Sequence, residues 1–257
     1  MQLSSARSPD VQHPFKMKAS CNERAPLKIL AIDSATSSCS AAVWCDGVVL
    51  SEQFEVMERG QSEILVPMIR DVLMASGLNF DNLDLVATTV GPGAFTGLRI
   101  CLSTARALAL AARLPVVGVT TFEAVAFAQG AIGTPLLVAI DSKRTDCYIQ
   151  LFDGHRVAVG PARAVLPTAV EDTLPATKIA LAGTAADSVK AALDASDRET
   201  YRVYGHDYPH AIHVAALAAE RVVRAMPRHG ENSPEPVYLR PPDVTVITAK
   251  TTFKTKS

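Results

Sequence analysis

The stretch LKILAID, residues 27–33, decides the fold of this chain. It has the pattern of a buried strand that ends in the carboxylate of Asp33. Strand-like runs follow at 39–44 and 48–52, and they are joined at Asp46-Gly47, a dipeptide typical of tight hairpins. We therefore expect the folded part of the chain to open with a strand and a hairpin.

Helices and strands alternate after this hairpin. The periodicity of apolar residues predicts a helix at 62–76, a strand at 84–90, a helix at 97–113 and a strand at 115–119. Together with the opening strands, these elements form a βββαβα unit.

A second unit begins at LLVAIDS, residues 136–142, which repeats the Ile-Asp-Ser ending of the first strand. Its further elements are expected as strands at 146–152, 156–165 and 178–182 and helices near 185–195 and 210–226. The repetition predicts a duplicated, two-lobed α/β fold built from βββαβα units. This arrangement is similar to that of the actin/sugar-kinase/Hsp70 (ASKHA) superfamily.

The domain boundaries follow from these units. We expect a flexible N-terminal extension at 1–26, because its Ser, Pro, Lys and Arg residues show no periodicity. The N-terminal lobe is then 27–125, the C-terminal lobe 126–226 and the C-terminal tail 227–257.

The composition is that of a globular protein with little net charge. Of the 257 residues, 48% are hydrophobic and 20% are charged, and the formal net charge is −1. Such a chain has no general attraction for nucleic acid, so we expect any RNA contact to be local or supplied by a partner. No apolar run reaches the length of a membrane span, and the five cysteines are scattered without a Cys-x-x-Cys pair. These features predict a cytoplasmic protein with reduced thiols and no membrane contact.

The run GPGAFTGLR at 91–99 connects a predicted strand to the helix that begins near Gly97. Gly93 can adopt backbone conformations that other residues avoid, and Thr96 can cap the helix with its hydroxyl. Such a loop can bind a phosphate at the helix N-terminus, or it can be a rigid connector. The run matches neither a Walker A motif nor Gly-x-Gly-x-x-Gly.

Asp33 and Asp141 stand at equivalent places in the two units, with Thr36 shortly after the first. In kinases of this superfamily such aspartates hold a metal–nucleotide. They can equally end a strand and accept hydrogen bonds from the N–H groups of the turn, which is the role that we favour. The candidate phosphate or nucleotide contacts are Asp33, Thr36, Gly93, Thr96 and Asp141.

Two of the predicted helices have patterned residues beyond the single apolar stripe that packing on a core requires. Helix 97–113 has an arginine at every seventh residue and, beside these, a strip of alanines that allows close approach of another helix. Helix 62–76 has one apolar stripe wide enough for a core and further apolar residues on another side. Periodicity alone leaves burial inside the protein and contact with a partner both open. The residues that we assign to a partner interface are Leu65, Ile69, Leu73, Arg99, Leu102, Ala105, Arg106, Ala109 and Arg113.

Three histidines, His206, His210 and His213, lie close together in the sequence. Pro209 is expected to open the last helix, so only His210 and His213 would share a face. We favour a polar helix start over a metal cluster and predict no metal site.

These pieces together resemble the TsaB (YeaZ) family, the dimerisation subunit of the bacterial tRNA threonylcarbamoyladenosine machinery. The resemblance is carried by ILAIDSAT at 29–36, Ser62-Glu63 followed by LVP at 65–67, GPGAFTGLR at 91–99, PVVGV at 115–119 and EPVYLR at 235–240. The pieces occur in the family's order and cover nearly everything from residue 28 to residue 245. One departure is Gln61, which stands where many members have a histidine.

The resemblance implies the two-lobed actin-like fold and a role in threonylcarbamoylating the adenosine beside the anticodon of some tRNAs. The related catalytic subunit, TsaD, carries a His-x-x-x-His metal pair at the positions that Thr121 and Val125 occupy here. Neither side chain replaces an imidazole as a ligand of a transition metal. The resemblance therefore implies a non-catalytic subunit that binds and activates a TsaD-like subunit.

The family also implies further partners and a ligand. A TsaE-like ATPase is expected in the complex, and tRNA is expected to bind only through the complex. We expect no cofactor of the chain's own, although ATP or ADP can lie at the complex interface, and a homodimer can form without the partner.

An independent ATPase or small-molecule kinase of the same fold is the main alternative, and a peptidase is the third. The kinase needs an adenosine loop, and the candidate LAGTAA at 181–186 has a single glycine. The peptidase needs a nucleophile or a metal pair, and no Gly-x-Ser-x-Gly motif is present. We therefore expect a non-catalytic scaffold rather than an enzyme.

Overall fold

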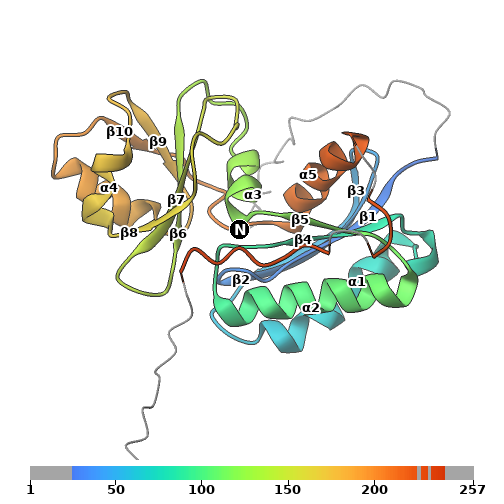
Figure 1. Ribbon diagram of the computed structural model, residues 1–257. Coiled ribbons are helices and arrows are strands. Elements are labelled where there is room, and N and C mark those ends of the chain that lie inside the picture. The colour runs from blue at the N-terminus through green and yellow to red at the C-terminus, as the bar shows by residue number, and fades with distance from the viewer. Residues whose placement is uncertain (1–24, 225–226, 231–232, 241–257) are drawn as a thin grey trace, which may run out of the picture.

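The computed structural model describes residues 25–224, 227–230 and 233–240, which form two α/β lobes (Figure 1). The predicted extension, apart from residues 25–26, and the end of the predicted tail lie outside these residues. Each lobe has a five-stranded sheet, and the strand orders correspond: β3-β2-β1-β4-β5 in the first and β8-β7-β6-β9-β10 in the second. This duplicated arrangement is the predicted two-lobed actin-like fold.

The first sheet contains the strands predicted at the start of the chain. β1 (Lys28–Asp33) lies at its centre, antiparallel to β2 (Ser38–Cys45) and parallel to β4 (Leu85–Thr89). β3 (Val48–Val56) pairs with β2 at one edge, and β5 (Val116–Val119) pairs with β4 at the other. Four of the five strands lie within a residue of the predicted bounds, because their apolar runs are clearly separated. β3 extends to Val56, four residues beyond its predicted end at 52.

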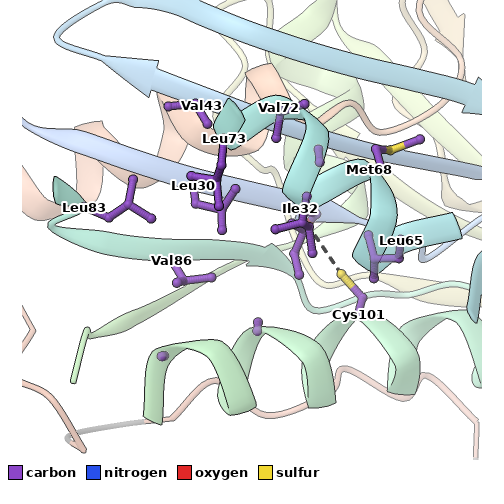
Figure 2. Close-up of a cluster of buried hydrophobic side chains, with 14 of the residues drawn as sticks. Leu30, Ile32, Val43, Leu65, Met68, Val72, Leu73, Leu83, Val86 and Cys101 are labelled. Atoms are coloured by element: carbon purple, nitrogen blue, oxygen red, sulfur yellow. Dashed lines mark hydrogen bonds between the residues drawn. The ribbon is translucent and has the colours of Figure 1, made fainter. Parts of the chain in front are cut away.

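Helices cover both faces of the first sheet. α1 (Gln61–Ser76) and α2 (Phe95–Ala112) pack on one face, and α5 (Ala211–Arg224) packs on the other. Figure 2 shows the core beneath α1 and α2, where the Cys101 thiol donates a hydrogen bond to the Ile32 carbonyl at 3.4 Å. The larger side chains of this core come from the sheet and from α1: Leu30, Ile32, Val43, Val86, Leu65, Met68, Val72 and Leu73. α2 contributes the smaller Cys101, Ala105 and Ala109.

The second sheet is shorter in its outer strands. It contains β6 (Leu136–Asp141), β7 (Cys147–Phe152), β8 (Arg163–Val165), β9 (Ile179–Ala182) and β10 (Thr200–Arg202). The prediction of one strand over 156–165 was wrong for its first part. The Asp153 carboxylate accepts hydrogen bonds from the N–H groups of His155 (2.8 Å) and Val157 (2.9 Å), and this turn delays the strand.

Two helices, α3 (Thr121–Ala128) and α5, each pack on the sheet of the other predicted lobe. α3 belongs mostly to the predicted first lobe but covers one face of the second sheet, and α4 (Ala186–Asp194) covers the other face. Conversely, α5 lies within the predicted second lobe (126–226) but packs on the first sheet. Lobe membership therefore does not follow sequence order at α3 and α5, which lie between the two sheets (Figure 1).

Short 3₁₀ turns complete the fold. They are η1 (Phe80–Asn82), η2 (Pro167–Ala169) and η3 (Glu171–Thr173).

Among the described residues, α2 is the one helix long and apolar enough to match a membrane span by length and composition. The sequence prediction that no run reaches that length is corrected here. One side of α2, including Leu98, Cys101 and Ala105, is buried within the first lobe, and core packing explains the apolar residues on that side. Leu110, on the opposite side, is 71% exposed.

Candidate functional site

The two aspartates that end β1 and β6 form the same turn in both lobes. The Asp33 carboxylate accepts a hydrogen bond from the Ala35 N–H at 3.1 Å, and the Asp141 carboxylate accepts one from the Lys143 N–H at 2.7 Å. Each aspartate thus satisfies the N–H group two residues further on, as in an Asx-turn. This geometry supports the favoured interpretation, in which both residues terminate strands.

Asp33 is fully buried. Its Oδ1 also accepts a hydrogen bond from the Thr89 hydroxyl at 2.5 Å, whereas its Oδ2 is buried without a hydrogen-bond partner. Burial raises the pKa of Asp33 to about 7, against the opposing effect of the hydrogen bonds from Thr89 and Ala35. The carboxyl is therefore partly protonated at neutral pH.

Asp141 is 40% exposed and lies beside a cation. The Lys143 ammonium is 3.5 Å from the Asp141 carboxylate and 3.2 Å from that of Glu58, which follows β3 in the first lobe. The two equivalent aspartates therefore have opposite environments: one is desolvated, and the other is solvated and paired.

A small polar cleft lies between these turns. Its volume is about 160 Å³, below the roughly 300 Å³ at which ligand pockets begin. Of the predicted contacts, Thr36 and Asp141 line it, whereas Asp33, Gly93 and Thr96 do not. The full lining is Thr36, Ser37, Glu58, Ala94, Asp141, Lys143, Thr184 and Tyr208.

The glycine-rich loop packs against its own chain. A methyl group on Gly93 would overlap the Ala35 carbonyl, and one on Gly97 would overlap the Ser34 carbonyl. The Ala94 N–H donates to the Ala35 carbonyl at 2.7 Å, and the Ser34 hydroxyl donates to the Gly97 carbonyl at 2.8 Å. These contacts favour the rigid-connector interpretation, because the glycines make room for the turn after β1.

The prediction that Thr96 caps α2 was wrong. The N-cap residue is Ala94, and no side chain makes a capping hydrogen bond there. Thr96 lies in the first turn of the helix and is exposed.

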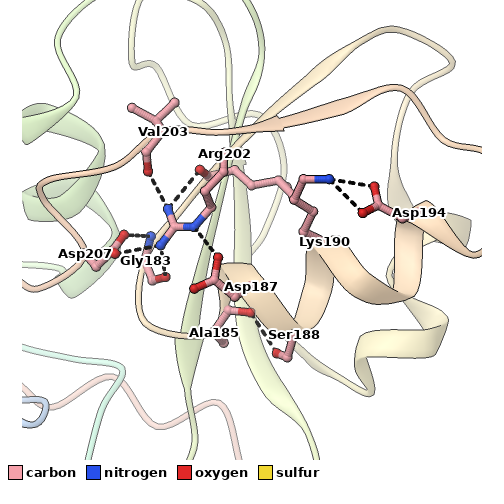
Figure 3. Close-up of polar contacts among 10 residues, drawn as sticks. Gly183, Ala185, Asp187, Ser188, Lys190, Asp194, Arg202, Val203 and Asp207 are labelled. Carbon is pink, nitrogen blue, oxygen red and sulfur yellow. Dashed lines mark hydrogen bonds and ion pairs between the residues drawn. The ribbon is translucent and has the colours of Figure 1, made fainter.

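In the second lobe, Arg202 holds the turn at Gly183-Thr184, which follows β9 (Figure 3). Its side chain is 3% exposed and pairs with Asp187 at 2.9 Å and Asp207 at 2.6 Å. Asp207 in turn accepts a hydrogen bond from the Gly183 N–H at 3.0 Å, and the Thr184 hydroxyl accepts one from the Asp141 N–H at 2.9 Å. The sequence analysis missed Arg202, since its partners come from other elements and leave no local pattern.

Six of the nine residues assigned to a partner interface lie inside the protein, which corrects that assignment. Their exposure is 6% or less because they face the first sheet rather than solvent, so they cannot contact a partner directly. They are Leu65, Ile69, Leu73, Leu102, Ala105 and Ala109.

Two of the three predicted interface arginines bind the chain's own C-terminal segment. The Arg106 guanidinium donates hydrogen bonds to the Pro234 carbonyl at 2.7 Å and the Ser233 hydroxyl at 3.1 Å. Arg99 lies 3.8 Å from the centre of the Phe95 ring and donates to the Tyr238 hydroxyl at 3.3 Å. Arg113 is exposed at the end of α2, where it adopts a left-handed conformation with φ 55°.

The start of α3 is a packed core position. Thr121 and Val125, which replace the expected metal-binding histidines, are both 0% exposed. Among the described residues, no group of three His, Cys, Asp or Glu side chains is arranged to hold a metal ion.

The structure brings all three histidines of the 206–213 stretch together. The rings of His206 and His210 are 5.7 and 5.9 Å from that of His213. The helix begins at Ala211 rather than at Pro209, so His213 lies on α5, whereas His206 and His210 precede it. His210 also stacks on Phe54 at 4.8 Å. Burial, aided by His206, lowers the pKa of His210 to about 4, so its imidazole is neutral at pH 7.

The buried cysteines of the first lobe are poor nucleophiles. Burial raises the pKa of Cys101 to about 11 and that of Cys39 to about 12, and both are free thiols. A thiol with such a pKa stays protonated at neutral pH.

Comparison with known proteins supports the class that the fold defines, an actin-like two-lobed protein. YeaZ from Pseudomonas aeruginosa matches with a TM-score of 0.68 and 27% identity, covering 83% of this chain and 100% of that one. A family model described as TsaD, tRNA N6-adenosine threonylcarbamoyltransferase, matches residues 50–246.

Relatives in sequence carry related names. The tRNA threonylcarbamoyladenosine biosynthesis protein TsaB of Escherichia coli is 41% identical over 126 residues, which are 48% of this chain and 53% of that protein. A tRNA N6-adenosine threonylcarbamoyltransferase of Novosphingobium aromaticivorans is 29% identical over 224 residues, 82% of this chain and 56% of that protein. The matches thus span about half the length of these two relatives. The chain belongs to the TsaB (YeaZ) family, within the group that the TsaD family model describes.

Proposed function

We propose that this protein is the non-catalytic subunit of a complex that forms threonylcarbamoyladenosine on tRNA, and that it binds and activates a TsaD-like subunit. The observation that carries the proposal is the start of α3, where buried Thr121 and Val125 stand in place of a metal-binding histidine pair. A hydroxyl and an isopropyl group in a packed core provide no transition-metal site. The names of the relatives support the pathway.

The remaining partners belong to the same proposal. We expect a TsaE-like ATPase in the complex, tRNA bound through the complex, and action in the cytoplasm. We propose that a nucleotide in the complex lies at the interface shared with the TsaD-like subunit. The chain's own cleft is small, and the space beside Gly93 and Gly183 is filled by the backbone carbonyls of Ala35 and Ala139. This geometry also disfavours the independent kinase.

The outward face of α1 and α2 is the proposed partner surface. Val66, Met74 and Leu110 are 59%, 73% and 71% exposed, although all three are apolar. Exposed Ala107 and Ala111 flank Leu110, so a facing helix can approach this side of α2 closely. Apolar and small side chains together suit a helix–helix contact with a TsaD-like subunit or a second copy.

Reconstitution tests the function. With the TsaD-like subunit of the same organism, the rest of the modification system and tRNA, modification should require this chain, and the chain alone should modify nothing. Efficient modification by the TsaD-like subunit in the absence of this chain would overturn the proposal.

Two matched variants test the surface. Leu110→Glu should keep its circular dichroism spectrum and lower affinity for the TsaD-like subunit by about 100-fold, because a charge would be buried at the contact. Val223→Glu, at an equally exposed position (76%) on α5, should bind normally. Normal binding by Leu110→Glu would place the contact elsewhere.

A further inference from the structure

The motif EPVYLR at 235–240 is not used by the proposed function. In the structure, residues 233–240 run along α2 from the first lobe to the second, as the red segment in Figure 1 shows. Each part of this segment is held by different contacts.

The start of the segment is fixed to the first lobe. Arg106 donates hydrogen bonds to the Pro234 carbonyl and the Ser233 hydroxyl at 2.7 and 3.1 Å. Gly118 of β5 provides the seat, since a methyl group there would overlap both Val90 and Pro234.

The middle of the segment is attached to the first lobe by one backbone hydrogen bond and one apolar side chain. The Val237 N–H donates to the Val90 carbonyl at 2.7 Å, and the Val237 side chain packs against a cluster with Ala35, Leu98 and Leu102. The backbone and one apolar side chain therefore both anchor it.

The end of the segment is fixed to the second lobe. Leu239 packs against the core cluster that contains Phe122 and Phe152. The Arg240 guanidinium, whose side chain is 40% exposed, lies 2.5 Å from the Asp146 carboxylate, whose side chain is only 2% exposed. The other oxygen of this carboxylate accepts a hydrogen bond from the neutral Ser142 hydroxyl at 2.8 Å, and Arg240 is its charged partner. A buried carboxylate depends strongly on its counter-charge, so this pair is a firm attachment.

Two other ion pairs join the lobes, and their carboxylates are more exposed than that of Asp146. Arg221 of α5 pairs with Glu123 of α3, and these side chains are 40% and 31% exposed. In the Lys143–Glu58 pair the side chains are 45% and 77% exposed, and solvent screens such a contact. Among these three links, the Arg240–Asp146 pair has the most buried carboxylate.

We propose that residues 233–240 are a strap that holds the two lobes at a fixed angle, with the Arg240–Asp146 pair as its lock. Two-lobed proteins commonly open and close about a hinge, and a segment anchored on both lobes opposes that motion. The strap also occupies the arginine side of α2, which leaves the side with Leu110 open to a partner. The inference does not depend on the identity of that partner.

Hydrogen–deuterium exchange of the full chain tests the strap. In Arg240→Gln, peptides that contain the cleft residues Ser37 and Thr184, from the two lobes, should exchange about tenfold faster than in wild type. Arg70→Gln is the matched control, because Arg70 pairs at 2.8 Å with its neighbour Asp71 within α1. Unchanged exchange at the cleft in Arg240→Gln would overturn the proposal.

A double variant separates the lock from simple charge neutralisation. Arg240→Gln leaves the buried Asp146 carboxylate, beside β7, without its guanidinium partner. Asp146→Asn in the same background removes that charge, so exchange inside β6 and β7 should then be as slow as in wild type. The cleft peptides should remain about tenfold faster than wild type, because the link between the lobes is still absent. Full return of the cleft peptides to wild-type rates would show that Arg240 only neutralises Asp146, and would overturn the strap.

Discussion

The two lobes share one topology and one aspartate turn, yet they place the aspartate in opposite environments. Asp33 is fully buried and has a pKa of about 7, whereas Asp141 is partly exposed beside Lys143. The difference arises from the glycine-rich loop at 91–97, which closes over the first turn through backbone contacts. In the second lobe the residue after the turn, Lys143, reaches across the cleft instead. The comparison teaches that a duplicated motif can become a closed structural element in one lobe and stay open in the other.

The largest expected effect concerns two glycines that pack against backbone: Gly93 against the turn after β1, and Gly183 against strand β6. Gly93→Ala and Gly183→Ala should each cost about 4–5 kcal/mol of unfolding free energy, because the added methyl would overlap the backbone at Ala35 or Ala139. Gly130→Ala is the control: its φ is +68° but the space is open, so only backbone strain of about 1 kcal/mol is expected. Urea denaturation measures all three, and a loss no greater at Gly93 than at Gly130 would break the comparison.

The next effect concerns the buried carboxyl. The folded pKa of Asp33, about 7, lies above the ordinary 3.8, so its contribution to stability is lost as pH rises from about 4 to about 7. Asp33→Asn should therefore be more stable than wild type at pH 8, by up to about 4 kcal/mol. Asp141→Asn should differ little from wild type. Thermal unfolding at pH 5 and pH 8 checks this, and a destabilised Asp33→Asn at pH 8 would contradict the assignment.

A smaller effect of opposite sign belongs to His210. Its folded pKa, about 4, lies below the ordinary 6.5, so stability is lost as pH falls from about 6.5 to about 4. The loss at pH 5 should be about 2 kcal/mol relative to pH 8.

His210→Phe keeps the stacking on Phe54 and should remove this pH dependence. Because Asp33 and His210 titrate in overlapping windows with opposite signs, the wild-type profile should be nearly flat, and each variant should tilt it in its own direction. Parallel profiles for wild type and His210→Phe would refute the assignment.

The smallest effect is expected at the exposed link between the lobes. Lys143→Gln breaks the pairs with Asp141 and Glu58, but solvent screening limits the loss to about 0.5 kcal/mol. A loss of several kcal/mol in denaturant unfolding would show that the exposed turn at Asp141 is held as tightly as the buried turn at Asp33.

The sequence predicted the elements of the first sheet and the duplication because their apolar runs are long and their turns carry clear signals. The capping box of Thr120 and Glu123 marked the start of α3, but the helix has only eight residues and was missed. The packing of α3 and α5 on the opposite sheets depends on contacts between distant segments, which leave no periodic signal.

The assignment of six buried residues to the candidate interface was wrong for a related reason. Ala105 and Ala109 have the same helical spacing as Ala107 and Ala111, and periodicity does not say which pair faces the sheet. For Arg99 and Arg106 the sequence carries no local sign of their hydrogen-bond partners, because Ser233, Pro234 and Tyr238 lie more than 120 residues away.

The central claim is that this chain's own aspartate turns are structural and take no part in the chemistry of the complex. The most direct measurement is tRNA modification by the reconstituted complex containing Asp33→Asn and Asp141→Asn together, with assembly confirmed by size-exclusion chromatography. The account predicts a rate within about twofold of wild type, because neither carboxylate contributes to the transition state. A loss of about 100-fold in a fully assembled complex would contradict it and would favour a nucleotide-using enzyme of the same fold.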